Sequence, residues 1–217
     1  MPCASQVGAS ILSVLTEPKW FKGYLKDLLE VRLKTQEWAE SCGRRRPACL
    51  RKDFVIDEYQ VDEALAHGGD TVLLMVSILS KSRLKALVDY CRSNGMEPLV
   101  EVVTSQELSV ALSCDAKVIG VNNRNLHSLV LDKNRTKAIA LELTAQGVKL
   151  GSEKKLLALS GLATAEDVAQ CREIACSGIL VGEALMRASD PGVGHTWWNI
   201  GAFLLFLIQL KVDDDYC

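Results

Sequence analysis

The sequence has little of several features that mark particular classes of protein. It has only three histidines, His67, His127 and His195, and their spacing matches no metal-ligand pattern. The formal net charge is −2, so the basic excess that binds nucleic acid is missing. The longest mostly apolar run, residues 197–210, has about fourteen residues, whereas a membrane-spanning helix needs about 20. We therefore expect no metal site and no nucleic-acid partner, and a membrane span is disfavoured.

Cysteine is present, but not in the arrangements that bind zinc or build a disulfide framework. The eight cysteines contain no C-x-x-C pair, and no secretory signal is recognisable. Free thiols of this kind suit a reducing compartment. We expect a cytoplasmic location, with a plastid left open.

Short apolar runs alternate with longer amphipathic stretches over most of the chain. This alternation is typical of repeated βα units on a parallel sheet, whose strands are buried on both faces and therefore rich in Val, Leu and Ile. Three intervening segments begin with a helix-capping pattern, at Asp57, Thr104 and Thr164. The pattern predicts an α/β fold with seven strands, at residues 11–15, 48–50, 71–76, 98–103, 118–121, 156–159 and 178–181.

The composition changes after Pro191, which leads us to divide the chain into a barrel-like domain, 1–192, and a divergent hydrophobic tail, 193–217. The tail is interpreted as a terminal helix packed on the domain. A membrane-associated segment and a tail unrelated to the fold are the alternatives.

Polar residues end or interrupt three of the apolar runs. In a parallel α/β barrel the active site lies at the carboxyl ends of the strands, so Lys52, Glu101 and Asn122 are the candidate catalytic residues. A carboxylate in so apolar a strand is costly to desolvate, and burial raises its pKa toward the range of a general base. The alternative is that Glu101 forms a buried ion pair with Lys52 that serves packing alone.

Two glycine-containing turns follow the last two runs, Ser160-Gly161 and Gly182-Glu183. Loops at these positions form the phosphate site of many such barrels. A glycine after a strand often marks only a tight turn, but two in this order favour a phosphorylated small-molecule substrate.

Five motifs in order resemble those of the indole-3-glycerol-phosphate synthase family, a family of (β/α)₈ barrels in tryptophan biosynthesis. The resemblance spans roughly residues 8–192. The motifs are LTEPKWFKG at 15–23, LRKDF at 50–54, GMEPLVEV at 95–102, GVNNRNL at 120–126 and LVGEALMR at 180–187.

The resemblance implies a carboxy-lyase that cyclises, decarboxylates and dehydrates 1-(2-carboxyphenylamino)-1-deoxyribulose 5-phosphate without a metal or organic cofactor. Lys52 would then be the general acid in ring closure and Glu101 the base in the later dehydration, while Asn122 would bind polar substrate atoms.

The remaining family roles concern substrate binding. Phe21 would line the pocket of the anthranilate ring, or else serve only as a loop anchor. Arg124 would counter the substrate carboxylate, or else lie on the surface. The phosphate would be held chiefly by backbone N–H groups of Ser160, Gly161, Gly182 and Glu183.

One family element has no match in this sequence. The family's first strand carries a lysine and a glutamate that line the active site, and residues 1–10 do not resemble it. We therefore expect a barrel with seven of eight strands and two open edges, which are an aggregation hazard. As partners we expect other tryptophan-pathway domains, or a chain that supplies the missing strand. The alternative function is an inactive barrel that at most binds a phosphorylated ligand or a partner chain.

Overall fold

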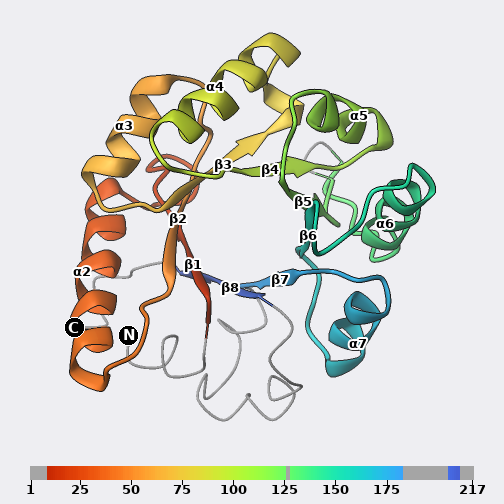
Figure 1. Cartoon of the computed structure of the whole chain (residues 1–217). Helices are drawn as coiled ribbons and strands as arrows, with labels where there is room; N and C mark the ends of the chain where they lie inside the picture. The colour runs from red at the N-terminus through yellow and green to blue at the C-terminus, as the bar shows by residue number, and fades with distance from the viewer. Residues whose placement is uncertain (1–8, 126–127, 183–204, 211–217) are drawn as a thin grey trace.

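The computed structural model of the chain describes residues 9–125, 128–182 and 205–210. Eight parallel strands form a closed barrel in chain order, and helices surround it on the outside (Figure 1). The strands are β1 (Ile11–Leu15), β2 (Ala48–Lys52), β3 (Thr71–Met75), β4 (Leu99–Val102), β5 (Val118–Asn122), β6 (Lys155–Leu159), β7 (Gly178–Val181) and β8 (Leu205–Leu210). The helices are α2 (Leu25–Cys42), α3 (Glu58–Ala66), the 3₁₀ turn η1 (Val76–Ile78), α4 (Lys81–Ser93), α5 (Ser105–Ser113), α6 (Arg135–Ala145) and α7 (Ala165–Glu173).

The first seven strands confirm the α/β-barrel prediction from the sequence. β1 and β7 have the predicted bounds, and the others differ from the predicted runs by one or two residues at an end. The predicted caps are also present: Asp57, Thr104 and Thr164 are the N-caps of α3, α5 and α7, and each side chain accepts a backbone N–H of the first turn. Local polar signals therefore set where these helices begin.

The tail differs from the sequence prediction. Leu205–Leu210 is a strand rather than a helix, and it pairs in parallel with β7 on one side and β1 on the other. The two edges that we expected to be open are therefore joined through β8 (Figure 1). The segment forms a strand because the unpaired N–H and C=O groups of two facing edges favour an extended partner. The sequence does not predict this, since the periodicity of a six-residue apolar run does not distinguish helix from strand.

β8 fills the place of a strand without supplying the family's charged groups. Its sequence, LFLIQL, contains no charged residue. The division at residue 192 into a barrel domain and a tail stays a prediction.

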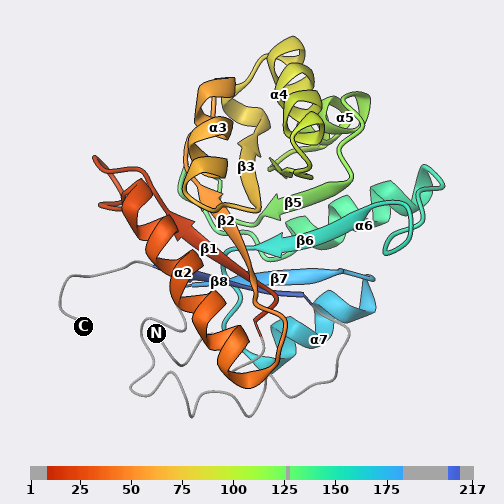
Figure 2. The ribbon, with the colours of Figure 1, turned by 60° about the vertical axis from the view of Figure 1, so that its left-hand side comes forward.

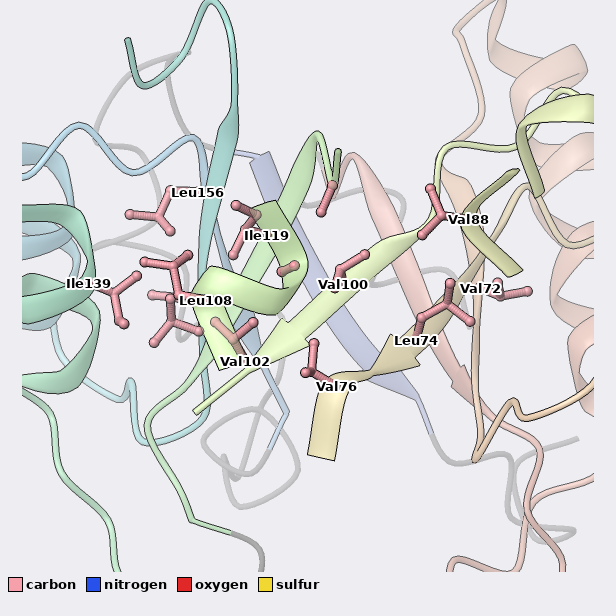
Figure 3. Close-up of a cluster of buried hydrophobic side chains, with 14 of the residues drawn as sticks. Val72, Leu74, Val76, Val88, Val100, Val102, Leu108, Ile119, Ile139 and Leu156 are labelled. Carbon is pink, nitrogen blue, oxygen red and sulfur yellow. The ribbon is translucent and has the colours of Figure 1, made fainter. Parts of the chain in front are cut away.

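Most of the hydrophobic core lies between the strands and the helices. Alternate residues of β3, β4, β5 and β6 point outward and pack against α4, α5 and α6 (Figure 3). α2 lies along β1 and β2 (Figure 2), where it buries Leu28 and Val31 against Leu12 and Val14. This packing fixes the strands at both faces, and so fixes the positions of the residues that end them.

The other face of the strands fills the barrel interior with leucine. Leu50, Leu73, Leu99, Leu157, Leu159 and Leu180, with Met75, form one buried cluster there. Side chains of this kind make the interior a packed core rather than a channel. Polar side chains at the carboxyl end of the barrel therefore lie against this apolar core.

Candidate functional site

Four of the predicted site residues come together at the carboxyl ends of the strands. Lys52 is the last residue of β2, Asn122 is the last residue of β5, and Glu101 lies in β4. Together with Ser160, which follows β6, they line a cavity of about 30 Å³ above Leu50 and Leu99. Three strands and a turn that are far apart in sequence thus present acidic, basic and amide groups to the same space.

Glu101 is buried, with 4% of its surface exposed. Burial raises the pKa of its carboxyl group, and the charge of Lys52 and a hydrogen bond from Asn122 oppose this without reversing it. In that bond Asn122 Nδ2 donates to Glu101 Oε1 over 3.1 Å. A carboxyl group with a raised pKa and an ordered orientation has the properties of a general base.

Lys52 acts on Glu101 through its charge rather than through direct contact. In the part of the chain that the structure describes, the ion pairs of β2 involve Arg51, and none joins Lys52 to Glu101. The interpretation of these two residues as a buried packing pair is therefore not supported. Both side chains line the same cavity, so an ammonium and a carboxyl group face one space.

The backbone on both sides of Lys52 is held by a buried polar network. The guanidinium of Arg51 donates to Asp53 Oδ2 over 2.9 Å, to the carbonyl of Gln60 over 2.6 Å and to Glu63 Oε2 over 3.1 Å. Thr16, after β1, donates its hydroxyl to Asp53 over 2.7 Å. β1, β2 and α3 are thereby tied together directly beneath the loop that follows Lys52.

Two aromatic rings meet between the loops that follow the first two strands. Phe21 lies in the loop after β1 and Phe54 in the loop after β2, with their ring centroids 5.9 Å apart. Both rings are partly exposed, at 42% and 36%. The Glu17 carboxylate accepts the backbone N–H groups of Trp20 and Phe21, which holds the first loop in a tight turn. The pair offers an apolar surface to a planar group.

The turn after β6 has an unusual backbone. Ser160 has φ 67° and Gly161 has φ 73°, so both residues are left-handed. For a non-glycine residue this costs about 1–2 kcal/mol, so Ser160 must be held by its surroundings. A Cβ atom on Gly161 would lie 2.5 Å from the Leu131 side chain, so the loop after β5 packs closely over this turn.

The N-terminus of α7, which follows this turn, is already occupied by an acidic side chain. Asp167 Oδ2 accepts the N–H groups of Ala163 and Thr164 over 2.9 and 3.0 Å, and Lys133 donates to its other oxygen over 2.7 Å. A second anion at this helix end would be repelled by the carboxylate.

The structure describes only some of the other predicted binding residues. Gly182 directly follows β7, and Glu183 lies outside the described residues. Arg124 follows Asn122 in the loop after β5, where its backbone N–H donates to Asn122 Oδ1 over 3.0 Å. This contact orients the Asn122 amide, so Arg124 has a positioning effect whatever its side chain binds.

A larger cavity, of about 240 Å³, lies at the opposite end of the barrel. Its lining includes the first residues of several strands, among them Ile11, Thr71 and Val118. Since the active sites of parallel barrels lie at the carboxyl ends of the strands, this cavity is not the candidate site.

No group of three metal-binding side chains occurs among the described residues. The expectation that the protein needs neither a metal nor an organic cofactor stays a prediction.

Three features of the site were missed by reasoning from the sequence. Phe54 could have been found from the sequence, because it is an aromatic residue two positions after Lys52, which ends a strand. Asn123, whose side chain donates to the Ser160 carbonyl oxygen over 3.1 Å, and the network of Arg51 depend on contacts between distant segments, which sequence patterns do not reveal.

Comparison with known proteins bears out the family resemblance of the sequence. The family model described as indole-3-glycerol phosphate synthase matches residues 3–193. A multifunctional tryptophan biosynthesis protein of Schizosaccharomyces pombe is 50% identical over 187 residues, which are 86% of this chain and 23% of that protein. The indole-3-glycerol phosphate synthase of Aquifex aeolicus is 39% identical over 86% of this chain and 66% of its own length. The chain thus spans about a quarter of the multifunctional relative.

Solved structures support the fold alone. A structure titled "Native KDPGal structure" has a TM-score of 0.60 and 16% identity, and the match covers 91% of this chain and 83% of that chain. The 3-hexulose-6-phosphate synthase of Salmonella typhimurium has a TM-score of 0.55 and 11% identity over 86% of this chain and 95% of its own.

Proposed function

Because the chain belongs to the indole-3-glycerol phosphate synthase family, we propose that it converts 1-(2-carboxyphenylamino)-1-deoxyribulose 5-phosphate to indole-3-glycerol phosphate in tryptophan biosynthesis. The reaction closes the ring and releases carbon dioxide and water. The observation that carries the proposal is the placement of Lys52 and Glu101 on one cavity without direct contact between them. An acid and a base can thus act on different atoms of the same substrate.

In this proposal Lys52 is the general acid. Ring closure places negative charge on the substrate carbonyl oxygen as the aromatic carbon attacks, and the Lys52 ammonium supplies the proton. Carbon dioxide leaves from the former carboxyl-bearing carbon. Its loss restores the benzene ring. Glu101 then removes a proton from the new five-membered ring, while the hydroxyl group takes up a proton from solvent and departs as water, which completes the indole. Asn122 holds the Glu101 carboxyl group and binds polar substrate atoms.

The remaining residues orient the two ends of the substrate. Phe21 and Phe54 cover the anthranilate ring, and Arg124 balances its carboxylate. The backbone of Ser160, Gly161, Gly182 and Glu183 receives the phosphate. Binding energy from these distant groups holds the reacting atoms together, which is a general source of catalysis.

The proposal is tested by adding the substrate to the purified chain and following the fluorescence of indole-3-glycerol phosphate. We expect turnover, with loss of carbon dioxide equal to the product formed. A chain that binds the substrate with no product would contradict the proposal.

The raised pKa of Glu101 predicts the position of the acid limb in the pH profile. A base must be unprotonated, so kcat/KM should fall as the pH drops through a value above the ordinary glutamate pKa of about 4.3. Asn122→Leu removes a hydrogen bond that lowers this pKa, so the limb should move to higher pH. An acid limb at or below the ordinary value in the wild type would exclude Glu101 as the base.

A substitution in the turn after β6 tests the phosphate site. Gly161→Ala adds a methyl group against Leu131 at a left-handed residue, so we expect KM to rise several-fold with a smaller change in kcat. Gly147→Ala is the matched control, because Gly147 is also left-handed, at φ 79°, but has open space around it. If both variants change KM equally, the turn does not bind the substrate.

A second candidate function is supported by β8. The resemblance leads us to expect two charged groups in the strand beside β1, and LFLIQL supplies none. A barrel that binds a phosphorylated ligand without converting it is consistent with this. Calorimetric titration with the substrate separates the two, since tight binding without turnover favours this candidate.

Other tryptophan-pathway domains are the partners we propose, because the relatives include multifunctional proteins of that pathway. For the location we propose the cytoplasm, since the six cysteines that the structure describes are free thiols. No helix in the described part of the chain is long and apolar enough to cross a membrane.

A further inference from the structure

Asn123 lies directly after Asn122 and is almost completely buried, at 1% exposure. Its side chain contacts two elements that are distant in sequence. Asn123 Nδ2 donates to the carbonyl oxygen of Ser160 over 3.1 Å, and Asn123 Oδ1 accepts the Thr136 hydroxyl over 2.8 Å. The amide thus joins the end of β5 to the turn after β6 and to the first turn of α6.

The backbone of Asn123 strengthens the same junction. Its N–H donates to the carbonyl of Leu159 over 2.9 Å, and its carbonyl oxygen accepts Arg135 Nη1 over 2.6 Å. These backbone hydrogen bonds fix the position of Asn123 independently of its side-chain contact with Ser160. A fixed donor of this kind can impose a direction on the group that it contacts.

That group is the peptide bond between Ser160 and Gly161. A peptide unit is planar and trans, so its C=O and N–H point in opposite directions. When Asn123 holds the Ser160 carbonyl oxygen, it also turns the Gly161 N–H away from Asn123. Both residues of the turn are left-handed, and Ser160 has no intrinsic preference for that state, so the contact selects one orientation of the peptide.

We infer that Asn123 is a positioning residue for phosphate recognition, which orients the Gly161 N–H toward the phosphate of the substrate. This inference rests on the proposed function and adds a residue that touches neither the substrate nor the reacting atoms. Its effect should therefore fall on phosphate affinity and not on the acid and base chemistry of Lys52 and Glu101.

The experiment compares Asn123→Ala with Thr136→Val. The first removes the donor to Ser160, whereas the second removes only the hydroxyl donor on the other side of the same amide. For Asn123→Ala we expect the Kd of inorganic phosphate, measured by calorimetry, and the KM of the substrate each to rise about tenfold. The kcat and the acid limb of the pH profile should stay within twofold of the wild type. For Thr136→Val we expect phosphate affinity within about twofold of the wild type.

A second variant keeps the inference falsifiable if Asn123→Ala does not fold. Asn123→Asp keeps the size and the acceptor for Thr136 but sets an oxygen against the Ser160 carbonyl, and it should weaken phosphate binding at least as much. Unchanged phosphate affinity in either folded variant, or a loss of kcat at constant KM, would overturn the inference.

The two proposals can fail separately in this design. If phosphate affinity depends on Asn123 but the wild-type protein shows no turnover, the lyase proposal is excluded and the positioning role is kept. If the wild type turns over the substrate but the Asn123 variants keep its phosphate affinity, the positioning role is excluded and the lyase proposal is kept.

Discussion

Glu101→Gln should reduce kcat by about 10²- to 10⁴-fold, the usual contribution of a general base. Gln has nearly the shape of Glu and can still accept the hydrogen bond from Asn122 through Oε1. The variant therefore removes the proton acceptor while keeping the packing of β4. The loss should appear in kcat, with substrate affinity within a few-fold of the wild type, in a turnover assay under saturating substrate.

The matched control is Glu97→Gln, which makes the same chemical change just before β4. Glu97 pairs with Arg92 over 2.8 Å and lines the cavity at the other end of the barrel. Its turnover should equal that of the wild type. Comparable kcat in Glu101→Gln and the wild type would remove Glu101 from the reaction.

Glu101→Gln can also be tested by a stability measurement, which does not depend on any activity. A carboxyl group whose pKa is raised in the folded state stabilises the fold below its unfolded pKa, and this stability is lost as the pH rises through the folded pKa. The wild type should thus lose stability as the pH rises from about 4.3, the ordinary glutamate pKa. Glu101→Gln should lack this part of the pH dependence of unfolding.

Arg51→Met should reduce the free energy of unfolding by about 3–5 kcal/mol, the usual cost of leaving one partner of a buried ion pair unpaired. The side chain of Arg51 is 4% exposed, and that of Asp53 is 9% exposed. Without the guanidinium, Asp53 keeps a buried charge, and the carbonyl of Gln60 loses a donor. Denaturant unfolding followed by circular dichroism measures the change.

Lys85→Met is the control for this prediction. Lys85 forms an ion pair with Asp89 on α4, and both side chains are about half exposed, at 48% and 54%. Exposed pairs contribute only about 0–1 kcal/mol, so little change is expected. In the double variant Arg51→Met with Asp53→Asn, part of the lost stability should return. A stability of Arg51→Met close to that of Lys85→Met would show that the network does not support the end of β2.

Repeating patterns in the sequence predict much of this barrel. The apolar runs at 11–15 and 178–181 become β1 and β7 with the same bounds, because parallel strands covered on both faces must be apolar. The caps at Asp57 and Thr164 are equally local, since a side chain there satisfies an N–H of its own helix.

The eighth strand could not be predicted in this way. Leu205–Leu210 is short and apolar, and its conformation depends on the edges of β1 and β7, which are far away in sequence. The residues of the candidate site likewise differ in whether local sequence or distant contacts reveal them. Glu101 is conspicuous as a carboxylate within an apolar run, whereas Asn123 gains its role only from contacts with Ser160 and Thr136.

β8 also bears on the competence of the site. It joins β7 to β1 and so removes the two open edges, but it restores the backbone pairing of a strand and not the charged groups expected there. If the chain is a lyase, Lys52 and Glu101 must therefore carry the acid and base chemistry within the part of the barrel that the structure describes.

The most direct test of this account is single-turnover kinetics with the synthetic substrate, comparing the wild-type chain with Lys52→Met. We predict formation of indole-3-glycerol phosphate by the wild type and none above the background rate by the variant, with both proteins binding the substrate. Equal rates in the two proteins, or binding without product in the wild type, would contradict the assignment of ring closure to this site.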